Sequence, residues 1–94
     1  MERLEKKLQE LGYRFIEDYF TGGTQKFCQK EIVKNDVIIG IYTNKEKTKI
    51  EDYEVEGYIC IDTQQQIDNL QQAFNEMQKD LAILKEIEKD ELEL

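Results

Sequence analysis

The chain has 94 residues and a formal net charge of −8, which suits one small acidic domain with a modest core. It contains no His and no Ser, so a Ser-His-Asp triad, a Cys-His pair and a His metal ligand are all excluded. The negative charge opposes direct binding to nucleic acid or to an anionic membrane, and it favours a partner with a basic surface. The simpler interpretation is that the acidic balance only keeps the protein soluble.

No apolar run approaches the length of a membrane span, and the N-terminal residues do not resemble a signal peptide. We therefore expect a soluble cytoplasmic protein. Cys28 and Cys60 lie far apart and match no metal-binding spacing, so we expect two reduced thiols packed in or beside strands. No metal and no cofactor is expected.

Residues 2 to 11 are predicted to form a short helix. Leu4, Leu8 and Leu11 lie on one face of it, and charged or amide side chains occupy the rest. Gly12 follows directly and is the usual residue at a helix C-terminus. Because so short a helix is marginal alone, its leucines need a partner, either the sheet or the long helix described below.

The segment 13–20 contains aromatic residues that alternate imperfectly around two acids, and whether it forms a strand is left open. Gly22 and Gly23 then indicate a hairpin connection. A phosphate-binding loop is excluded here, because the Gly-x-Gly-x-x-Gly pattern is absent and no helix follows.

Three further segments are predicted to be strands. Residues 25–33 are polar on both faces, which indicates an edge strand or a strand with one wet face. Residues 37–43 are the most β-prone run and should form the central strand. Residues 50–61 form one strand interrupted at Gly57 or two short ones, with four apolar residues sharing a face: Tyr53, Val55, Ile59 and Ile61.

Residues 62 to about 91 are predicted to form one long amphipathic helix, with the last residues, 89–94, frayed. Thr63 and Gln66 fit the Thr-x-x-Gln capping box, so the helix should begin near Gln64. Its apolar residues are spaced by three and four and fall on one stripe: Ile67, Leu70, Phe74, Met77, Leu81 and Leu84.

Beyond Met77 the apolar set broadens to two faces of this helix, and one sheet cannot cover both. We therefore predict a homodimer that uses four residues: Leu81, Ile83, Leu84 and Ile87. The alternative is intramolecular, with the leucines of the first helix covering the same surface.

These elements predict an α+β fold in a single domain, residues 1–94. A short N-terminal helix precedes an antiparallel meander of three to four strands, and the long C-terminal helix packs across the sheet. The predicted sheet contacts of that helix are Ile67, Leu70, Phe74 and Met77, with Phe74 in the core.

The third hairpin is acidic. Five acids lie within it: Glu46, Glu51, Asp52, Glu54 and Glu56. Glu54 and Glu56 point to one face, which should be the wet one. They stand roughly 7 Å apart, a spacing similar to that of consecutive nucleic-acid phosphates. The alternative is an ordinary solvated face, offset by nearby lysines, Lys45, Lys47 and Lys49. A glycosidase cleft and a calcium loop are disfavoured, because the domain is thin and lysines interrupt the acids.

The helix segment 63–81 resembles the C-terminal helix of small uncharacterised proteins of bacteriophages and mobile elements in low-GC Gram-positive bacteria. The resemblance is centred on Ile-Asp-Asn-Leu-Gln-Gln-Ala-Phe-Asn at residues 67–75, and Leu-Gly-Tyr at 11–13 is similar too. It implies a phage or prophage origin and no catalytic residue.

Small acidic phage proteins commonly bind and block host machinery, including CRISPR and restriction nucleases. By this analogy we expect a non-enzymatic inhibitor of a basic, nucleic-acid-handling host protein, acting as a DNA mimic in the host cytoplasm. Its partner-binding residues would be Glu51, Asp52, Glu54 and Glu56. The alternative is a structural or assembly protein that dimerises through its C-terminal helix.

Overall fold

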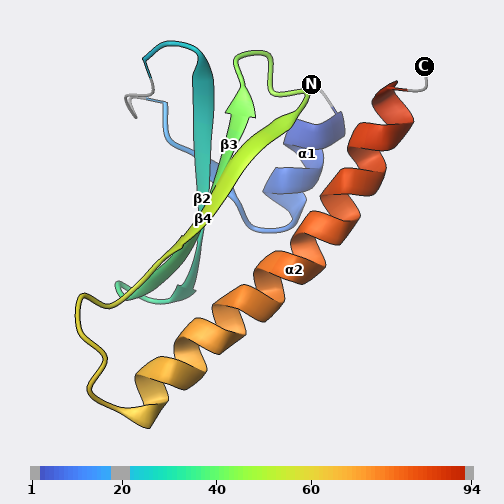
Figure 1. The fold of residues 1–94 in the computed structure, drawn as a ribbon. Helices are drawn as coiled ribbons and strands as arrows, with labels where there is room; N and C mark the ends of the chain where they lie inside the picture. The colour runs from blue at the N-terminus through green and yellow to red at the C-terminus, as the bar shows by residue number, and fades with distance from the viewer. Residues whose placement is uncertain (1–2, 18–21, 93–94) are drawn as a thin grey trace.

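The described part of the chain folds into two helices and a four-stranded antiparallel sheet (Figure 1). The structure is a computed structural model that describes residues 3–17 and 22–92. In chain order the elements are α1 (Arg3–Glu10), β1 (Arg14–Phe15), β2 (Gln25–Val33), β3 (Val37–Asn44), β4 (Ile50–Glu56) and α2 (Gln64–Leu92). The sheet order β1-β2-β3-β4 is a simple meander, which confirms the predicted α+β fold.

Both helices lie on the same face of the sheet, and α2 crosses it diagonally (Figure 1). The core between the layers combines leucines of both helices with the inward side chains of β2 and β3. Its buried members are Leu4, Leu8, Tyr13, Cys28, Ile39, Ile41, Leu81 and Leu84. The other face of the sheet is covered by neither helix.

The end of α1 has the hydrogen bonds of a Schellman motif. The N–H of Tyr13 donates to the carbonyl of Leu8 at 2.9 Å, and the N–H of Gly12 donates to the carbonyl of Gln9 at 3.1 Å. Gly12 has a φ of 104°, a conformation that glycine adopts without strain. The predicted stop of the first helix at Gly12 is therefore confirmed, and it directs Tyr13 into the core.

The predicted capping box at the start of α2 is also present. The N–H of Gln66 donates to the Thr63 hydroxyl oxygen at 3.2 Å, and the side-chain oxygen of Gln66 accepts from the N–H of Thr63 at 2.9 Å. These reciprocal bonds satisfy donors that a helix N-terminus leaves free. The helix begins at Gln64, as the sequence predicts.

Strands β2, β3 and β4 match the predicted segments, and β3 lies at the centre. Strand β1 covers only Arg14–Phe15 of the segment left open in the sequence, and residues 18–20 of that segment lie outside the described residues. The hairpin glycines Gly22 and Gly23 both have positive φ values, 76° and 79°, in the connection to β2.

The predicted strand at 58–61 is wrong. Those residues form an irregular connection to α2, and Ile59 and Ile61 are exposed instead of sharing a buried face with Val55. The reason lies at Gly57, where an added Cβ would stand 2.6 Å from Cδ2 of Leu70. The backbone passes against α2 at this point and leaves the sheet.

The predicted sheet-facing side of α2 needs a correction. Phe74 is 50% exposed and Ile67 is 45% exposed, whereas Ala73 is buried and Leu70 and Met77 are half-buried. Residues seven apart form one row along a helix, and the row Ile67–Phe74–Leu81 is exposed at its first two positions and buried at Leu81, where α1 joins the core. The sequence pattern identifies the apolar stripe but not which of its rows meets the sheet.

The predicted dimer residues Leu81 and Leu84 are used within the chain, which corrects their assignment. Leu84 is fully buried and Leu81 nearly so, in one cluster with Leu4 and Leu8 of α1. The first helix thus supplies the cover that the intramolecular alternative required. Ile83 and Ile87 are half-buried, and dimerisation itself stays a prediction.

Candidate partner-binding surface

The strand register gathers the acidic residues of β4 on the face of the sheet that neither helix covers. Ile39, buried in the core, pairs with Val55, so the alternate residues of β4 point away from the helices. Three rows of side chains therefore run across this open face from β2 to β4: Phe27–Tyr42–Asp52, Gln29–Gly40–Glu54 and Glu31–Ile38–Glu56. We call these nine positions the open face, because neither helix covers it. Phe27 and Gly40 are buried within it, whereas Glu31, Asp52 and Glu56 are exposed. The nine positions include four acids and no lysine or arginine.

Glu51 lies beside the open face, at the irregularity where the register between β3 and β4 shifts. Its carboxylate accepts a hydrogen bond from the side-chain amide of Gln25 on β2 at 2.9 Å. The carboxylate of Glu54 accepts one from the hydroxyl of Tyr42 at 3.1 Å. Both donors are neutral, so they hold the carboxylates in place without cancelling their charge.

Exposure agrees with this arrangement: Glu51, Asp52 and Glu56 are exposed, and Glu54 is half-buried. Within residues 3–17 and 22–92, no ion pair involves any of the four. The sequence-predicted partner-binding residues are therefore brought together on one side of β4.

The lysines expected to offset these acids do not all face them. Lys47 has a φ of 60° in the turn before β4, and its ammonium lies 3.2 Å from the carboxylate of Glu5 on α1 and 4.4 Å from the ring centre of Phe15. Its charge is thereby directed to the side of α1. Lys45 and Lys49 are exposed in the same turn.

Glu31 is a residue of this surface that the sequence analysis missed. It is exposed on β2 and shares a row with Glu56, from which Ile38 separates it. The alternation along β2 indicated its face, but the register between strands decides that it lies opposite the end of β4.

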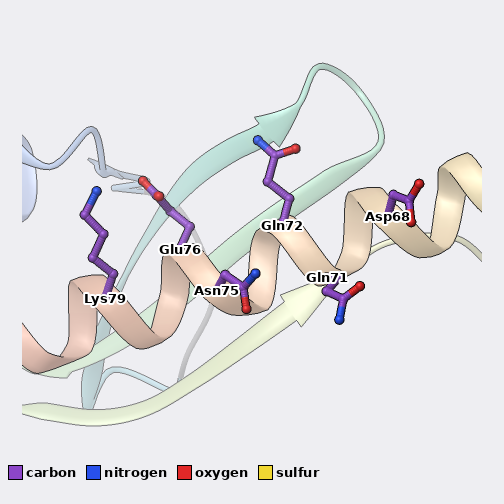
Figure 2. Close-up of a pocket in the computed structure, with 6 residues that line it drawn as sticks. All are labelled: Asp68, Gln71, Gln72, Asn75, Glu76 and Lys79. Atoms are coloured by element: carbon purple, nitrogen blue, oxygen red, sulfur yellow. The ribbon is translucent and has the colours of Figure 1, made fainter.

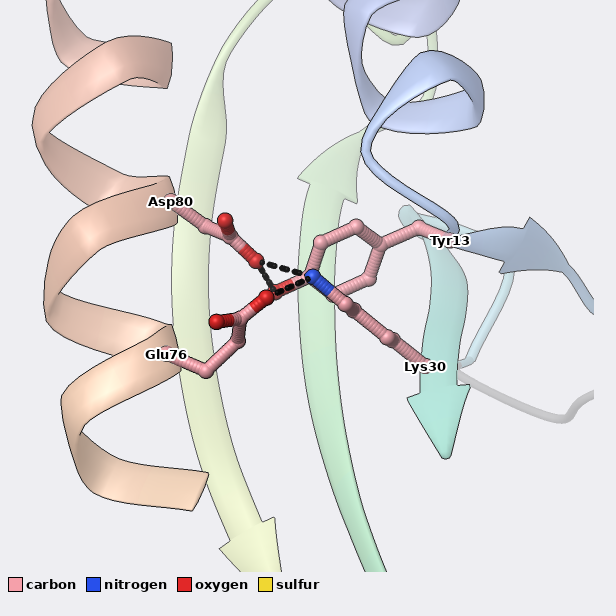
Figure 3. Close-up of polar contacts among 4 residues, drawn as sticks. All are labelled: Tyr13, Lys30, Glu76 and Asp80. Carbon is pink, nitrogen blue, oxygen red and sulfur yellow. Dashed lines mark hydrogen bonds and ion pairs between the residues drawn. The ribbon is translucent and has the colours of Figure 1, made fainter. Parts of the chain in front are cut away.

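An ionic cluster on the helix side of the sheet links α2 to β2 and to Tyr13, which follows the end of α1 by three residues (Figure 3). Asp80 is 1% exposed and accepts hydrogen bonds from the Tyr13 hydroxyl at 2.9 Å and from the Lys30 ammonium at 2.8 Å. The Lys30 ammonium also lies 2.7 Å from the carboxylate of Glu76. The cluster thus joins three segments that are distant in the sequence.

The electrostatics of this cluster are those of a structural site. Burial raises the pKa of Tyr13 far above its usual range, and the neighbouring carboxylate of Asp80 adds to the rise. Burial opposes the charged form of Lys30, but its hydrogen bonds to Asp80 and Glu76 outweigh burial and raise its pKa. Because Tyr13 stays neutral and Lys30 stays charged at neutral pH, neither is suited to proton transfer there.

The outer side of α2 carries a shallow polar hollow of about 410 Å³ (Figure 2). All six of its lining residues come from this single helix: Asp68, Gln71, Gln72, Asn75, Glu76 and Lys79. A hollow with one helix as its wall cannot enclose a substrate or set two groups across a reacting bond. We assign it no function.

The described residues contain no group of three or more His, Cys, Asp or Glu side chains that could hold a metal ion. In the same part of the chain, no helix combines the length and apolar character needed to cross a membrane. Cys28 is buried, and burial raises the pKa of its thiol to about 12. Cys60 is exposed in the connection before α2, which corrects its expected place in or beside a strand.

Among the residues whose side chains the structure describes, the exposed large apolar ones all belong to β4, to the connection after it or to the first half of α2: Tyr53, Ile59, Ile61, Ile67 and Phe74. Such clustering is typical of contact surfaces. Comparison of the chain with protein-family models, curated proteins and solved structures finds no match.

Proposed function

We propose that this protein is a non-enzymatic binding protein whose open face and Glu51 bind the basic, nucleic-acid-binding surface of another protein and thereby block it. One observation carries the proposal: four carboxylates of β4 and Glu31 of β2 lie around one sheet face whose nine positions include no basic residue. A sheet face that carries acids and no base is complementary in charge to a surface that otherwise contacts a phosphate backbone.

Charge and geometry both support this function. Glu54 and Glu56 are two residues apart on one strand and so repeat at roughly 7 Å. The neutral donors Tyr42 and Gln25 restrict two of the carboxylates, which lowers the entropy lost when a partner binds. The net charge of −8 would also accelerate association with a basic protein.

The origin and the target class remain predictions. The resemblance of the α2 sequence to phage proteins, together with this surface, favours a host nuclease or another nucleic-acid-handling host protein as the partner. The structural or assembly role through α2 is the competing function. It is less favoured because Leu81 and Leu84, which the sequence assigned to that interface, lie in the core.

A capture experiment with two charge-matched variants tests the proposal. The purified protein is immobilised and exposed to lysate of a low-GC Gram-positive host at low salt. The test variant replaces Glu51, Glu54 and Glu56 by Gln and Asp52 by Asn. The control variant removes four exposed acids outside this hairpin with the same chemistry: Glu10, Glu17 and Glu86 to Gln and Asp68 to Asn.

Both variants change the net charge from −8 to −4, because each loses four carboxylates. We expect the parent and the control variant to retain the same partner and the test variant to lose at least about tenfold of it. Added duplex DNA and rising salt should both displace the partner from the parent. Equal loss in both variants, or retention unaffected by DNA, would mean that the open face does not imitate a nucleic acid.

A further inference from the structure

Strand β4 lies at an edge of the sheet, and at its start the N–H of Ile50 donates to the carboxylate of Glu88 on α2 at 2.6 Å. Strand β4 has β3 as its only strand neighbour in the described chain, so its outer backbone groups have no strand partner. The N–H of Tyr53 donates to the carboxylate of its own neighbour Asp52 at 2.9 Å. A local bond of this type can be exchanged for the carbonyl of an added strand, which would also release Asp52 for an ion pair.

An apolar hollow lies beside this edge, between β4 and α2. It measures about 450 Å³, and its lining residues are Tyr53, Met77, Gln78, Leu81, Ala82 and Lys85. Tyr53 is on the helix side of β4, because it pairs with the buried Ile41. An added strand next to β4 would therefore direct every second side chain into this hollow and the others toward Asp52, Glu54 and Glu56.

The charge of β4 decides which kind of strand fits. The strand carries four acids and no base in seven residues, so a second copy pairing edge to edge would oppose carboxylates to carboxylates. A segment with basic side chains on the open-face side meets the opposite charge instead. The hollow on the other side requires apolar side chains at the alternate positions.

We propose that the β4 edge binds an extended segment of the partner in which basic and apolar residues alternate, adding a fifth strand to the sheet. The inference rests on the proposed function for the sign of the partner's charge, and it adds the binding mode and a sequence pattern. Main-chain hydrogen bonds to β4 then contribute affinity, while the two sets of side chains provide specificity.

The test uses blocked, fluorescently labelled peptides of the same length as β4. The alternating peptide is Lys-Val-Lys-Val-Lys-Val-Lys, and the block isomer Lys-Lys-Lys-Lys-Val-Val-Val has the same composition and charge. Binding is measured by fluorescence anisotropy. We expect the alternating peptide to bind at least about tenfold more tightly, because only it can place both sets of side chains at once. Equal affinities would overturn the inference.

Two further comparisons separate strand addition from simple charge attraction. Alternating peptides N-methylated on either the valines or the interior lysines differ in which backbone edge is blocked. Only one of the two should lose binding, because only one edge of an added strand faces β4. Two methylated peptides that bind alike would also overturn the inference.

On the protein, Ala82→Lys fills the hollow at an exposed position, and Gln72→Lys makes the same charge change elsewhere on α2. Ala82→Lys should reduce the affinity for the alternating peptide to that for the block isomer. Gln72→Lys should leave the alternating peptide binding more tightly than the block isomer. If both peptides bind equally and both depend on the β4 acids, only the edge inference fails. If neither binds or the acids do not matter, the proposed function fails with it.

Discussion

Removing the ammonium of Lys30 should destabilise the protein more than any surface change. Lys30→Met keeps a long apolar stem beside Tyr13 but leaves the carboxylate of Asp80, which is 1% exposed, without its cation at 2.8 Å. Leaving a buried charge unpaired costs about 3–5 kcal/mol. Because the free energy of unfolding of a small domain is only about 5–15 kcal/mol, this loss would remove a large part of the stability.

The measurement is urea unfolding followed by helix circular dichroism, with the melting temperature as a second readout. At about 4–8 °C per kcal/mol for a domain of this size, Lys30→Met should melt more than about 10 °C below the parent. Glu76→Gln is the matched control, because the side chain of Glu76 is 33% exposed and Lys30 retains Asp80. It should cost about 1 kcal/mol or less.

A double variant separates the buried charge from a general packing defect. Asp80→Asn added to Lys30→Met removes the unpaired carboxylate and still offers an oxygen to the hydroxyl of Tyr13. The double variant should therefore be more stable than Lys30→Met alone. A double variant less stable than the single one, or a loss in Lys30→Met no larger than in Glu76→Gln, would refute this account of the cluster.

The stability difference between the parent and the control variant Glu76→Gln should depend on pH in a definite direction. Hydrogen bonding to Lys30 and then its charge lower the pKa of Glu76 below the ordinary value of 4.5. A depressed pKa in the folded state means that the carboxylate contributes stability above pH 4.5 and that this contribution disappears as the pH falls through the lower folded value. The stability difference between parent and Glu76→Gln should accordingly be constant near neutral pH and shrink below 4.5.

Three other predictions follow from burial. Leu84→Ala should lower the free energy of unfolding by about 2–5 kcal/mol, because Leu84 is fully buried. Phe74→Ala, at a half-exposed position, should lower it clearly less in the same thermal melts. Equal losses of stability would place Phe74 in the core. In the native protein one thiol, Cys60, should react quickly with a disulfide reagent and Cys28 only after unfolding; two fast thiols would contradict the burial of Cys28. If the protein is a homodimer, Phe74→Ser should reduce the mass found by light scattering toward one chain of 11.2 kDa, and a parent that is already monomeric would exclude the dimer.

The sequence by itself determined the order and type of the two helices and of strands β2, β3 and β4. The Gly after α1, the Thr63–Gln66 capping box and the β-branched run of β3 are local signals, because each acts through hydrogen bonds or backbone preferences of neighbouring residues. Side chains of a strand alternate between its two faces, and this rule placed Glu54 and Glu56 of β4 on one face. For these features the local chemistry is sufficient, and the tertiary structure agrees with it.

Only the tertiary structure decided which surfaces are covered. Periodicity marked the apolar stripe of α2 but could not show that Phe74 is half-exposed or that α1 covers Leu84, because both depend on how separate elements meet. Nor could it place Asp80 beside Lys30, 50 residues away. The open face has the same origin: strand register sets Glu31 in the row of Glu56, and pairing between distant segments fixes that register.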